Sequence, residues 1–302
     1  QQQKAMTLLV DVGTNAEIVL GDENRLLACS SPTGPAFEGA QISAGQRAAA
    51  GAIERVRIDP DTLVARFKVI GSDLWSDEPG FIEETSKFGV TGICGSGIIE
   101  VVAEMYLSGI VTVDGIIDGE LASRSPLVVA DGRTWSYVLY QSDLTENQAP
   151  ILVTQNDIRQ IQLAKAALYA GVKLLMDKLD IDHVDRIRLA GAFGSHINVQ
   201  HAMVLGLIPD CALDQVSSAG NAAGTGARIA LLNNQSRNTI EDLVTNIEKI
   251  ETAMEPKFQQ YFVDAMAFPN KTDPFPNLFS TIDKPPEKLI TESPGGRKRR
   301  RR

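Results

Sequence analysis

Two short segments combine glycine with residues that could bind a phosphate and a metal ion. The first, VDVGTNAE (residues 10–17), is an apolar β-branched run that ends in Asp11, Gly13, Thr14 and Asn15. Gly13 lets the backbone turn tightly, and the amides of Gly13, Thr14 and Asn15 could then face a phosphate, as in other backbone anion sites. Asp11 could hold a magnesium ion through water. An ordinary hairpin with Asp, Gly and Asn as turn formers explains the same residues equally well.

The second segment, RLAGAFGSHI (residues 188–197), places small residues directly after a predicted strand. They allow a flat heterocycle to lie on the backbone, and they are Gly191, Ala192, Phe193 and Gly194. The alternative is a plain strand–turn–helix junction. A third segment, AGNAAGTGARIALL (residues 219–232), predicts a helix with several glycines, each about 1 kcal/mol less favourable than alanine inside a helix. Close packing or a ligand near the helix start would explain these glycines, and we favour packing.

Other polar residues give weaker signals. The TGICGSG segment (residues 91–97) precedes a predicted helix, so its amides could bind an anion, although a tightly packed helix entry is favoured. Glu38, in GPAFEGA, lines either a site or an interface. Glu17 could face the phosphate region only through strand alternation, which puts it on one face with Asn15. The three histidines have no metal-ligand spacing, and no catalytic base can be identified.

The predicted elements alternate between strands and helices. Strands are expected at 6–13, 16–20, 25–30, 126–130, 135–141, 186–190 and 216–218, with a hairpin over 53–70. Helices are expected at 40–50, 98–108, 154–179, 199–205, 222–233, 239–254 and 256–266. We therefore expect an α/β domain over residues 1–270 with an insertion at about 31–150. Because prolines become frequent from 269 onward, residues 271–302 are expected to form a disordered, Pro-rich and basic tail.

Composition excludes several classes of protein. With 43% hydrophobic and 22% charged residues, the 302-residue chain is typical of a globular protein, and it has no apolar run long enough for a membrane span. Net charge is −9, or −15 without the six basic residues 297–302, which argues against nucleic acid as the partner. The three cysteines are far apart and contain no CxxC, so we expect buried thiols in a reducing cytoplasm rather than a metal site. The chain does not look like a natural start, and we expect it to belong to a longer protein.

The order of these motifs resembles the second half of actin-like ATPases, whose ribonuclease H-like fold binds ATP between two halves. The resemblance implies that Asp11, Gly13, Thr14 and Asn15 form the second phosphate motif, and that Gly191, Ala192, Phe193 and Gly194 form the adenosine motif. Longer segments resemble the C-terminal part of the reductive activators of corrinoid proteins over residues 6–269. These segments are DVGTNAEIVLG, GPAFEGAQIS, TGICGSGIIE, TQNDIRQIQLAKAA, LAGAFGSHI, GLIPD and GNAAGTGARIALL.

That resemblance implies a function in electron transfer. ATP and Mg²⁺ would be the cofactors of this chain, and ATP hydrolysis would drive Co(II) to Co(I) reduction of a corrinoid protein of a methyltransferase system. A ferredoxin-like domain with a 2Fe–2S cluster would lie upstream, since this chain has no such cysteine cluster and no first phosphate motif. A homodimer is a further partner to consider. The alternatives are a small-molecule kinase of the same superfold and a non-catalytic partner-binding or dimerisation module.

Overall fold

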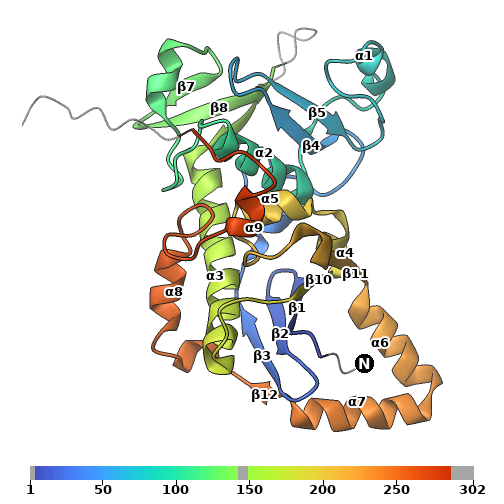
Figure 1. Cartoon of the computed structure of the whole chain (residues 1–302). Helices are drawn as coiled ribbons and strands as arrows, with labels where there is room; N and C mark the ends of the chain where they lie inside the picture. Colours follow the sequence, from blue (N-terminus) through green and yellow to red (C-terminus); the bar gives the residue numbers. More distant parts are fainter. Residues whose placement is uncertain (1–3, 142–148, 287–302) are drawn as a thin grey trace, which may run out of the picture.

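The computed structural model describes residues 4–141 and 149–286, except for the side chains of Ala192 and Phe193. A six-stranded mixed sheet forms the lower body of the molecule in Figure 1, in the order β11–β10–β1–β2–β3–β12. Its strands are β1 (Thr7–Val12), β2 (Ala16–Gly21), β3 (Leu26–Ser31), β10 (Arg186–Ala190), β11 (Val216–Gly220) and β12 (Glu248–Lys249). The first three strands form an antiparallel meander, whereas β10 runs parallel to β1 and β11 runs parallel to β10.

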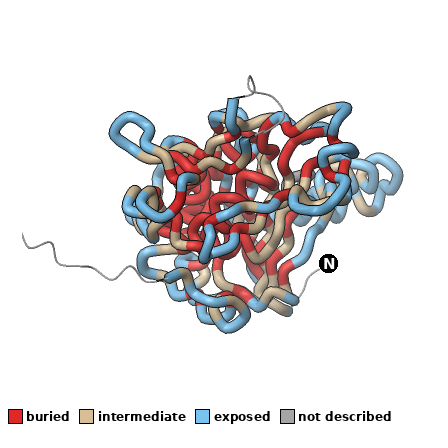
Figure 2. Tube along the Cα trace, turned by 90° about the horizontal axis from the view of Figure 1, so that it is seen from above, coloured by how far each residue is buried: buried red, intermediate tan, exposed pale blue. Residues whose placement is uncertain are grey.

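The helix α3 (Gln155–Leu179) covers one face of this sheet and continues into the upper part of the molecule (Figure 1). It begins with the expected capping box: the Thr154 hydroxyl accepts from the Asp157 amide at 3.2 Å, and the Asp157 carboxylate accepts from the Thr154 amide at 2.8 Å. Gly171 lets the helix backbone touch the sheet, because a Cβ there would lie 2.5 Å from Ser31 Oγ. The residues between helix and sheet form part of the buried interior seen in Figure 2.

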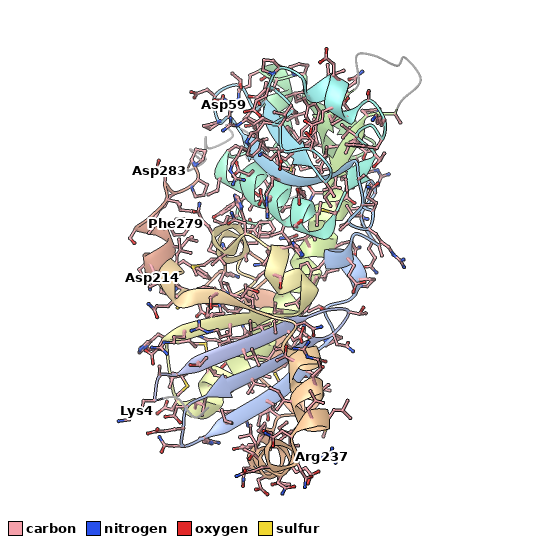
Figure 3. The ribbon with its side chains drawn as sticks, turned by 90° about the vertical axis from the view of Figure 1, so that its right-hand side faces the viewer. Lys4, Asp59, Asp214, Arg237, Phe279 and Asp283 are labelled. Atoms are coloured by element: carbon pink, nitrogen blue, oxygen red, sulfur yellow. The ribbon has the colours of Figure 1, made fainter. Side chains whose placement is uncertain are left out.

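The described residues between β3 and α3, called here the inserted part, form two small sheets and two helices above the main sheet (Figure 1). One sheet contains β4 (Ala52–Ile58), β5 (Ala65–Val69) and β6 (Gly92–Ile93), and the other contains β7 (Val128–Asp131), β8 (Thr134–Tyr140) and β9 (Ile151–Thr154). The helices are α1 (Phe81–Thr85) and α2 (Gly95–Leu107), with 3₁₀ turns η1 (Pro35–Glu38) and η2 (Gly119–Ser123). α2 is buried along most of its length against β4. Asp59, in the β4–β5 turn, is labelled on the upper left side of Figure 3.

The remaining elements follow β10. They are α4 (Gly191–His196), α5 (Val199–Val204), η3 (Leu213–Gln215), α6 (Ala222–Leu232), α7 (Asn234–Asn246), η4 (Thr252–Met254), α8 (Phe258–Asp264) and α9 (Pro276–Phe279). α6 and α7 extend away from the main sheet, and α7 carries the labelled Arg237 at the lower end of Figure 3. α8 lies along α3. None of the helices formed by the described residues combines the length and apolar character that a membrane span requires.

The structure departs from the expected elements in several places, among them residues 40–50, the region after α6 and the C-terminal tail: the expected helix at 239–254 is replaced by α7, β12 and η4. Residues 40–50 form turns instead of a helix, because Gly39 and Gly45 approach so closely that a Cβ on Gly45 would lie 2.0 Å from the Gly39 carbonyl oxygen. Packing against another element does not explain the glycines of α6: a Cβ on Gly226 would meet open space, one on Gly224 would meet the side chain of Asn221, which caps the same helix, and no residue of α6 is buried. A further departure is the expected tail, since Phe275 and Leu278 are buried and α9 is formed there; residues 287–302 lie outside the described residues.

Candidate nucleotide-binding site

The sheet brings the first two glycine motifs together. β1 and β10 are parallel neighbours with Asp11 in register with Ala190, so both strands end at the same edge of the sheet. Gly191 then turns the chain with φ +81°, a left-handed conformation that favours glycine. A Cβ on Gly191 would lie 2.4 Å from Asp11 Oδ1. The candidate metal ligand and the start of the candidate adenosine turn are therefore in direct contact.

The hairpin turn after β1 has fewer free amides than its sequence suggests. The Gly13 amide donates to the Asn15 carbonyl oxygen at 2.9 Å and closes the turn. Thr14 and Asn15 are exposed, and the described residues offer their amides no hydrogen-bond partner. In this conformation two of the three expected amides, rather than all three, are available to an anion.

The segment after β10 is a short helix, where the sequence predicts a turn. α4 begins at Gly191 without an intervening loop. Gly194 packs its backbone against the end of the strand, since a Cβ there would lie 2.8 Å from the carbonyl carbon of Leu189. A larger residue at this position would push α4 away from β10. The backbone of Ala192 and Phe193 belongs to this helix, and their side chains lie outside the described atoms.

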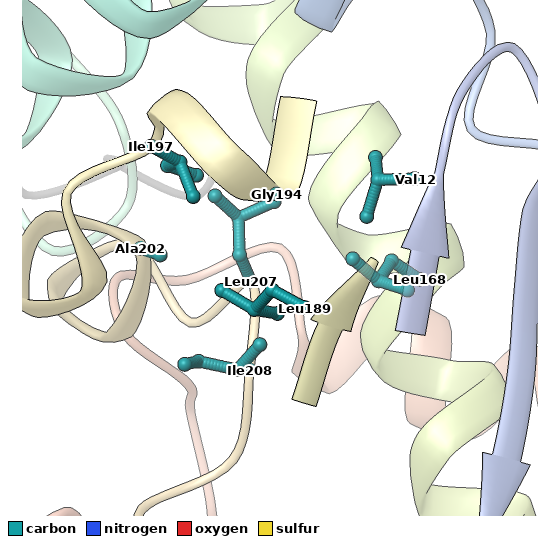
Figure 4. Close-up of a pocket in the computed structure, with 8 residues that line it drawn as sticks. All are labelled: Val12, Leu168, Leu189, Gly194, Ile197, Ala202, Leu207 and Ile208. Carbon is teal, nitrogen blue, oxygen red and sulfur yellow. The ribbon is translucent and has the colours of Figure 1, made fainter. Parts of the chain in front are cut away.

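An apolar void lies beneath the two motifs, as Figure 4 shows. Its volume is about 10 Å³, which is enough for one water molecule at most. The lining residues come from both motifs, α3 and the α5 region, and they are Val12, Leu168, Leu189, Gly194, Ile197, Ala202, Leu207 and Ile208. With no polar lining and so little room, it is a packing defect of the scaffold and not a place for a nucleotide.

Two acidic residues join Asp11 at this edge of the sheet. Glu17 lies directly opposite Asp11 in the antiparallel β1–β2 register, so both side chains are on one face, and its Oε1 accepts from Ser30 Oγ at 3.5 Å. Glu38 reaches the hairpin from the inserted part, where its Oε1 accepts from Thr14 Oγ1 at 2.9 Å. The alternation of side chains along a strand predicts that Glu17 shares a face with Asn15. The contact of Glu38 joins residues 24 apart and has no periodic signal in the sequence.

The far end of α4 is tied to the inserted part by charged groups. Arg55 on β4 donates to the His196 carbonyl oxygen at 3.1 Å and pairs with the fully buried Glu100 of α2 at 2.9 Å. The buried His201 of α5 pairs through Nε2 with Glu104 Oε1 at 2.8 Å. The described residues contain no group of three or more His, Cys, Asp or Glu side chains arranged to hold a metal ion. His201 is instead hydrogen-bonded to a carboxylate of α2.

The cysteines are structural. All three are free and buried. Burial raises the pKa of the Cys29 thiol to about 12 and, with help from the charge of Asp210, that of Cys211 to about 11. Both thiols are therefore protonated at neutral pH, which confirms the expected buried cysteines.

Comparison with known proteins identifies the family. A family model described as the C-terminal domain of RACo, the ASKHA domain, matches residues 5–279. The corrinoid activation enzyme RamQ of Eubacterium limosum is 33% identical over 273 residues, which cover 88% of this chain and 43% of that protein. A reductase of Methanosarcina barkeri, named for a Co(II) methylated amine-specific corrinoid protein, is 26% identical over 82% of this chain and 42% of its own length.

A solved structure points to the same family as these relatives. A reductive activator for a corrinoid, iron–sulfur protein superposes with a TM-score of 0.76 at 32% identity, covering 93% of this chain and 42% of that one. The chain thus spans less than half the length of the relatives it matches. Because the family model matches nearly the whole described chain and the mixed α/β fold agrees, the chain belongs to the family of C-terminal ASKHA (actin-like ATPase) domains of the reductive activators of corrinoid proteins.

Proposed function

We propose that this chain is the nucleotide-binding second half of an ATP-dependent reductive activator of a corrinoid protein. The observation that carries the proposal is the direct contact between Asp11, at the end of β1, and Gly191, at the start of α4. Ligands of α/β sheets bind outside the carboxyl ends of the strands, and these two residues lie at such an edge. The names of the relatives support this reading over a small-molecule kinase or a non-catalytic module.

The residues at this edge fit a magnesium–nucleotide complex. Asp11 is partly exposed, and the described residues place no hydrogen-bond donor on its carboxylate, so this hard oxygen ligand is available to Mg²⁺. Bound there, the ion would neutralise charge on the phosphates. The amides of Thr14 and Asn15 would face phosphate oxygens, while Gly13 closes the turn that presents them. Gly191, Ala192, Phe193 and Gly194 would provide the backbone surface for adenosine.

The rest of the activity needs parts beyond this chain. We propose that an upstream region supplies the first phosphate motif and a ferredoxin-like domain whose 2Fe–2S cluster delivers the electron. Closure of the two halves on ATP would change the contact with the corrinoid protein, which is the hinge type of conformational switch. Arg55 and Glu100 would pass that closure from α4 to the inserted part, since they already join the two.

The test is ATP-dependent corrinoid reduction by this chain joined to its upstream iron–sulfur region. The visible absorption of a Co(II) corrinoid protein is followed under a chemical electron donor, with and without Mg·ATP. We expect formation of Co(I) that requires Mg·ATP and is lost in Asp11→Asn. Reduction at the same rate without ATP, or in that variant, would refute the proposal. Asp77→Asn, an exposed acid of the inserted part, serves as the matched control.

A further inference from the structure

The Glu38 carboxylate meets the phosphate hairpin from outside the main sheet. Thr14 Oγ1 donates to Glu38 Oε1 at 2.9 Å, and both residues are exposed. Among the described residues, the second carboxylate oxygen, Oε2, has no hydrogen-bond partner. One oxygen of Glu38 is therefore held by the hydroxyl of the phosphate hairpin, while the other remains available as an acceptor.

The segment leading to Glu38 is attached to the same hairpin. Thr33 Oγ1 donates to the Gly13 carbonyl oxygen at 2.7 Å, and the Gly34 amide donates to the Thr14 carbonyl oxygen at 2.9 Å. Phe37, next to Glu38, is only 1% exposed and anchors η1 in the core. These bonds hold the backbones of Glu38 and Thr14 in one unit. Backbone contacts therefore support the hydrogen bond between their two exposed side chains.

The segment after Glu38 is fixed as well. Gly39 ends η1 with φ +81°, and a Cβ there would lie 3.0 Å from the Gln46 amide nitrogen. The Ser43 amide donates to the buried Asp157 Oδ1 at 2.7 Å, at the start of α3. η1 lies against both α2 and α3. Glu38 therefore stands on a preorganised support at the junction of the hairpin, the long helix and the inserted part.

The negative charge of Glu38 limits which ligand groups it can contact. A carboxylate bonded to the Thr14 side chain puts a negative charge at the hairpin proposed to receive a phosphate, and like charges repel, so Glu38 opposes nucleotide binding. A hydrogen-bond acceptor at this place suits a water molecule, which donates its protons to it. Resting on the proposed function, we propose that Glu38, acting with the Thr14 hydroxyl, is a positioning residue that holds the attacking water for ATP hydrolysis.

The step that Glu38 supports is balanced without another reactant. The oxygen of water forms a bond to the γ-phosphorus as the bond from that phosphorus to the bridging oxygen breaks, and ADP leaves with the electron pair. The proton of the water ends on the released phosphate. Glu38 accepts a hydrogen bond from the water and aims its lone pair at phosphorus, which is an orientation effect.

Glu38→Gln in the chain joined to its upstream region tests this role, because the amide keeps an acceptor for Thr14 and removes the charge. Mg·ATP affinity and steady-state phosphate release are measured separately, with Glu23→Gln at an exposed turn as control. We expect affinity to tighten about two- to five-fold, since repulsion of the phosphate is relieved. We expect kcat to fall about 10- to 100-fold, since the water loses its orientation. Thr14→Val should lower kcat similarly, and Thr14→Ser should restore it.

The outcomes separate this inference from the proposed function. Tighter or equal binding of Mg·ATP with a much lower kcat supports the positioning role. Loss of a purely structural role would instead weaken binding and lower kcat together. An unchanged kcat in Glu38→Gln overturns it. Weaker binding together with a lower melting temperature also overturns it, since Glu38 would then only hold η1 in place. If the unsubstituted protein neither binds nor hydrolyses ATP, the proposed function itself fails.

Discussion

Gly191 is the residue on which the geometry of the site depends. Its positive φ starts α4 directly from β10, and its missing side chain leaves room for the Asp11 carboxylate. The sequence predicts that small residues follow this strand. It does not predict the contact with Asp11, because that contact depends on the pairing of β1 with β10 across about 180 residues of chain.

Gly191→Ala should therefore be more destabilising than an alanine at an equally left-handed but open position. Gly132, with φ +61° and open space around its Cβ position, is the matched control. We expect about 1 kcal/mol for Gly132→Ala from backbone strain alone. We expect at least about 2 kcal/mol for Gly191→Ala, which adds the clash with Asp11. Urea denaturation measures both, and equal losses would contradict the packing described here.

The sequence predicts the other contacts of the site only in part. Strand alternation places Asn15 and Glu17 on one face, but only the observed register puts Glu17 opposite Asp11. The Gly13 amide could not be assigned from sequence, because whether it closes the turn or faces a ligand depends on the turn type. The sequence marks Glu38 as a candidate site or interface residue. It does not predict the contact with Thr14, because Thr14 belongs to another element.

At the scale of elements, the most regular patterns were predicted well. The apolar periodicity and the Thr154 capping box predict α3. The Asp–Pro–Asp sequence predicts the turn between β4 and β5, which form a hairpin. The sequence predicts α6 as a helix, but it also favours close packing as the reason for its glycines, and no residue of α6 is buried. Leu231 and Leu232 are 76% and 83% exposed there. Periodicity predicts a helix from local residues, whereas its packing partner depends on tertiary structure.

The cap of α3 should contribute more stability than the caps of the exposed helices. Asp157 is fully buried, and its carboxylate accepts from the Thr154 amide and from the amide and hydroxyl of Ser43. Asn cannot accept on both of its terminal atoms, so Asp157→Asn should cost about 2–4 kcal/mol. Asn233→Ala, at the exposed cap of α7, should cost about 1 kcal/mol or less. Chemical denaturation of both variants is the measurement; similar losses would count against this reading.

At the scale of the whole molecule, α3 joins the main sheet, the inserted part and the C-terminal segment. The buried Lys165 donates through Nζ to the carbonyl oxygens of Ala267 and Pro269, and Gln162 donates to those of Asp114 and Met266. Two further residues of α3 extend the ordered body past the boundary near residue 270 expected from composition, because the Tyr169 hydroxyl and Lys173 Nζ each donate to the Asp273 carboxylate at 2.9 Å. Proline content alone could not show this, because prolines are compatible with an ordered segment whose carbonyls find buried donors.

Lys165 should make stability depend on pH. Burial lowers its pKa well below the usual value of 10.5, so the unfolded chain binds this proton more tightly than the folded protein. The contribution of Lys165 to the free energy of unfolding therefore rises with pH between the lowered pKa and about 10.5. Lys165→Met should flatten that rise in denaturation curves taken from pH 7 to 10, whereas the exposed Lys271→Met should not. Parallel pH profiles for Lys165→Met and the unsubstituted protein would contradict this assignment.

Calorimetric titration with Mg·ATP measures directly whether Asp11 and Gly191 mark a nucleotide site. The chain is titrated alone and with its upstream region, in the unsubstituted form, in Asp11→Asn and in the control Asp77→Asn. We expect saturable heat in the unsubstituted and control proteins, with affinity at least about 10-fold weaker in Asp11→Asn because the metal ligand is lost. Binding that is equally strong in Asp11→Asn, or no heat from a folded complex with the upstream region, would contradict a nucleotide site at the meeting point of Asp11 and Gly191.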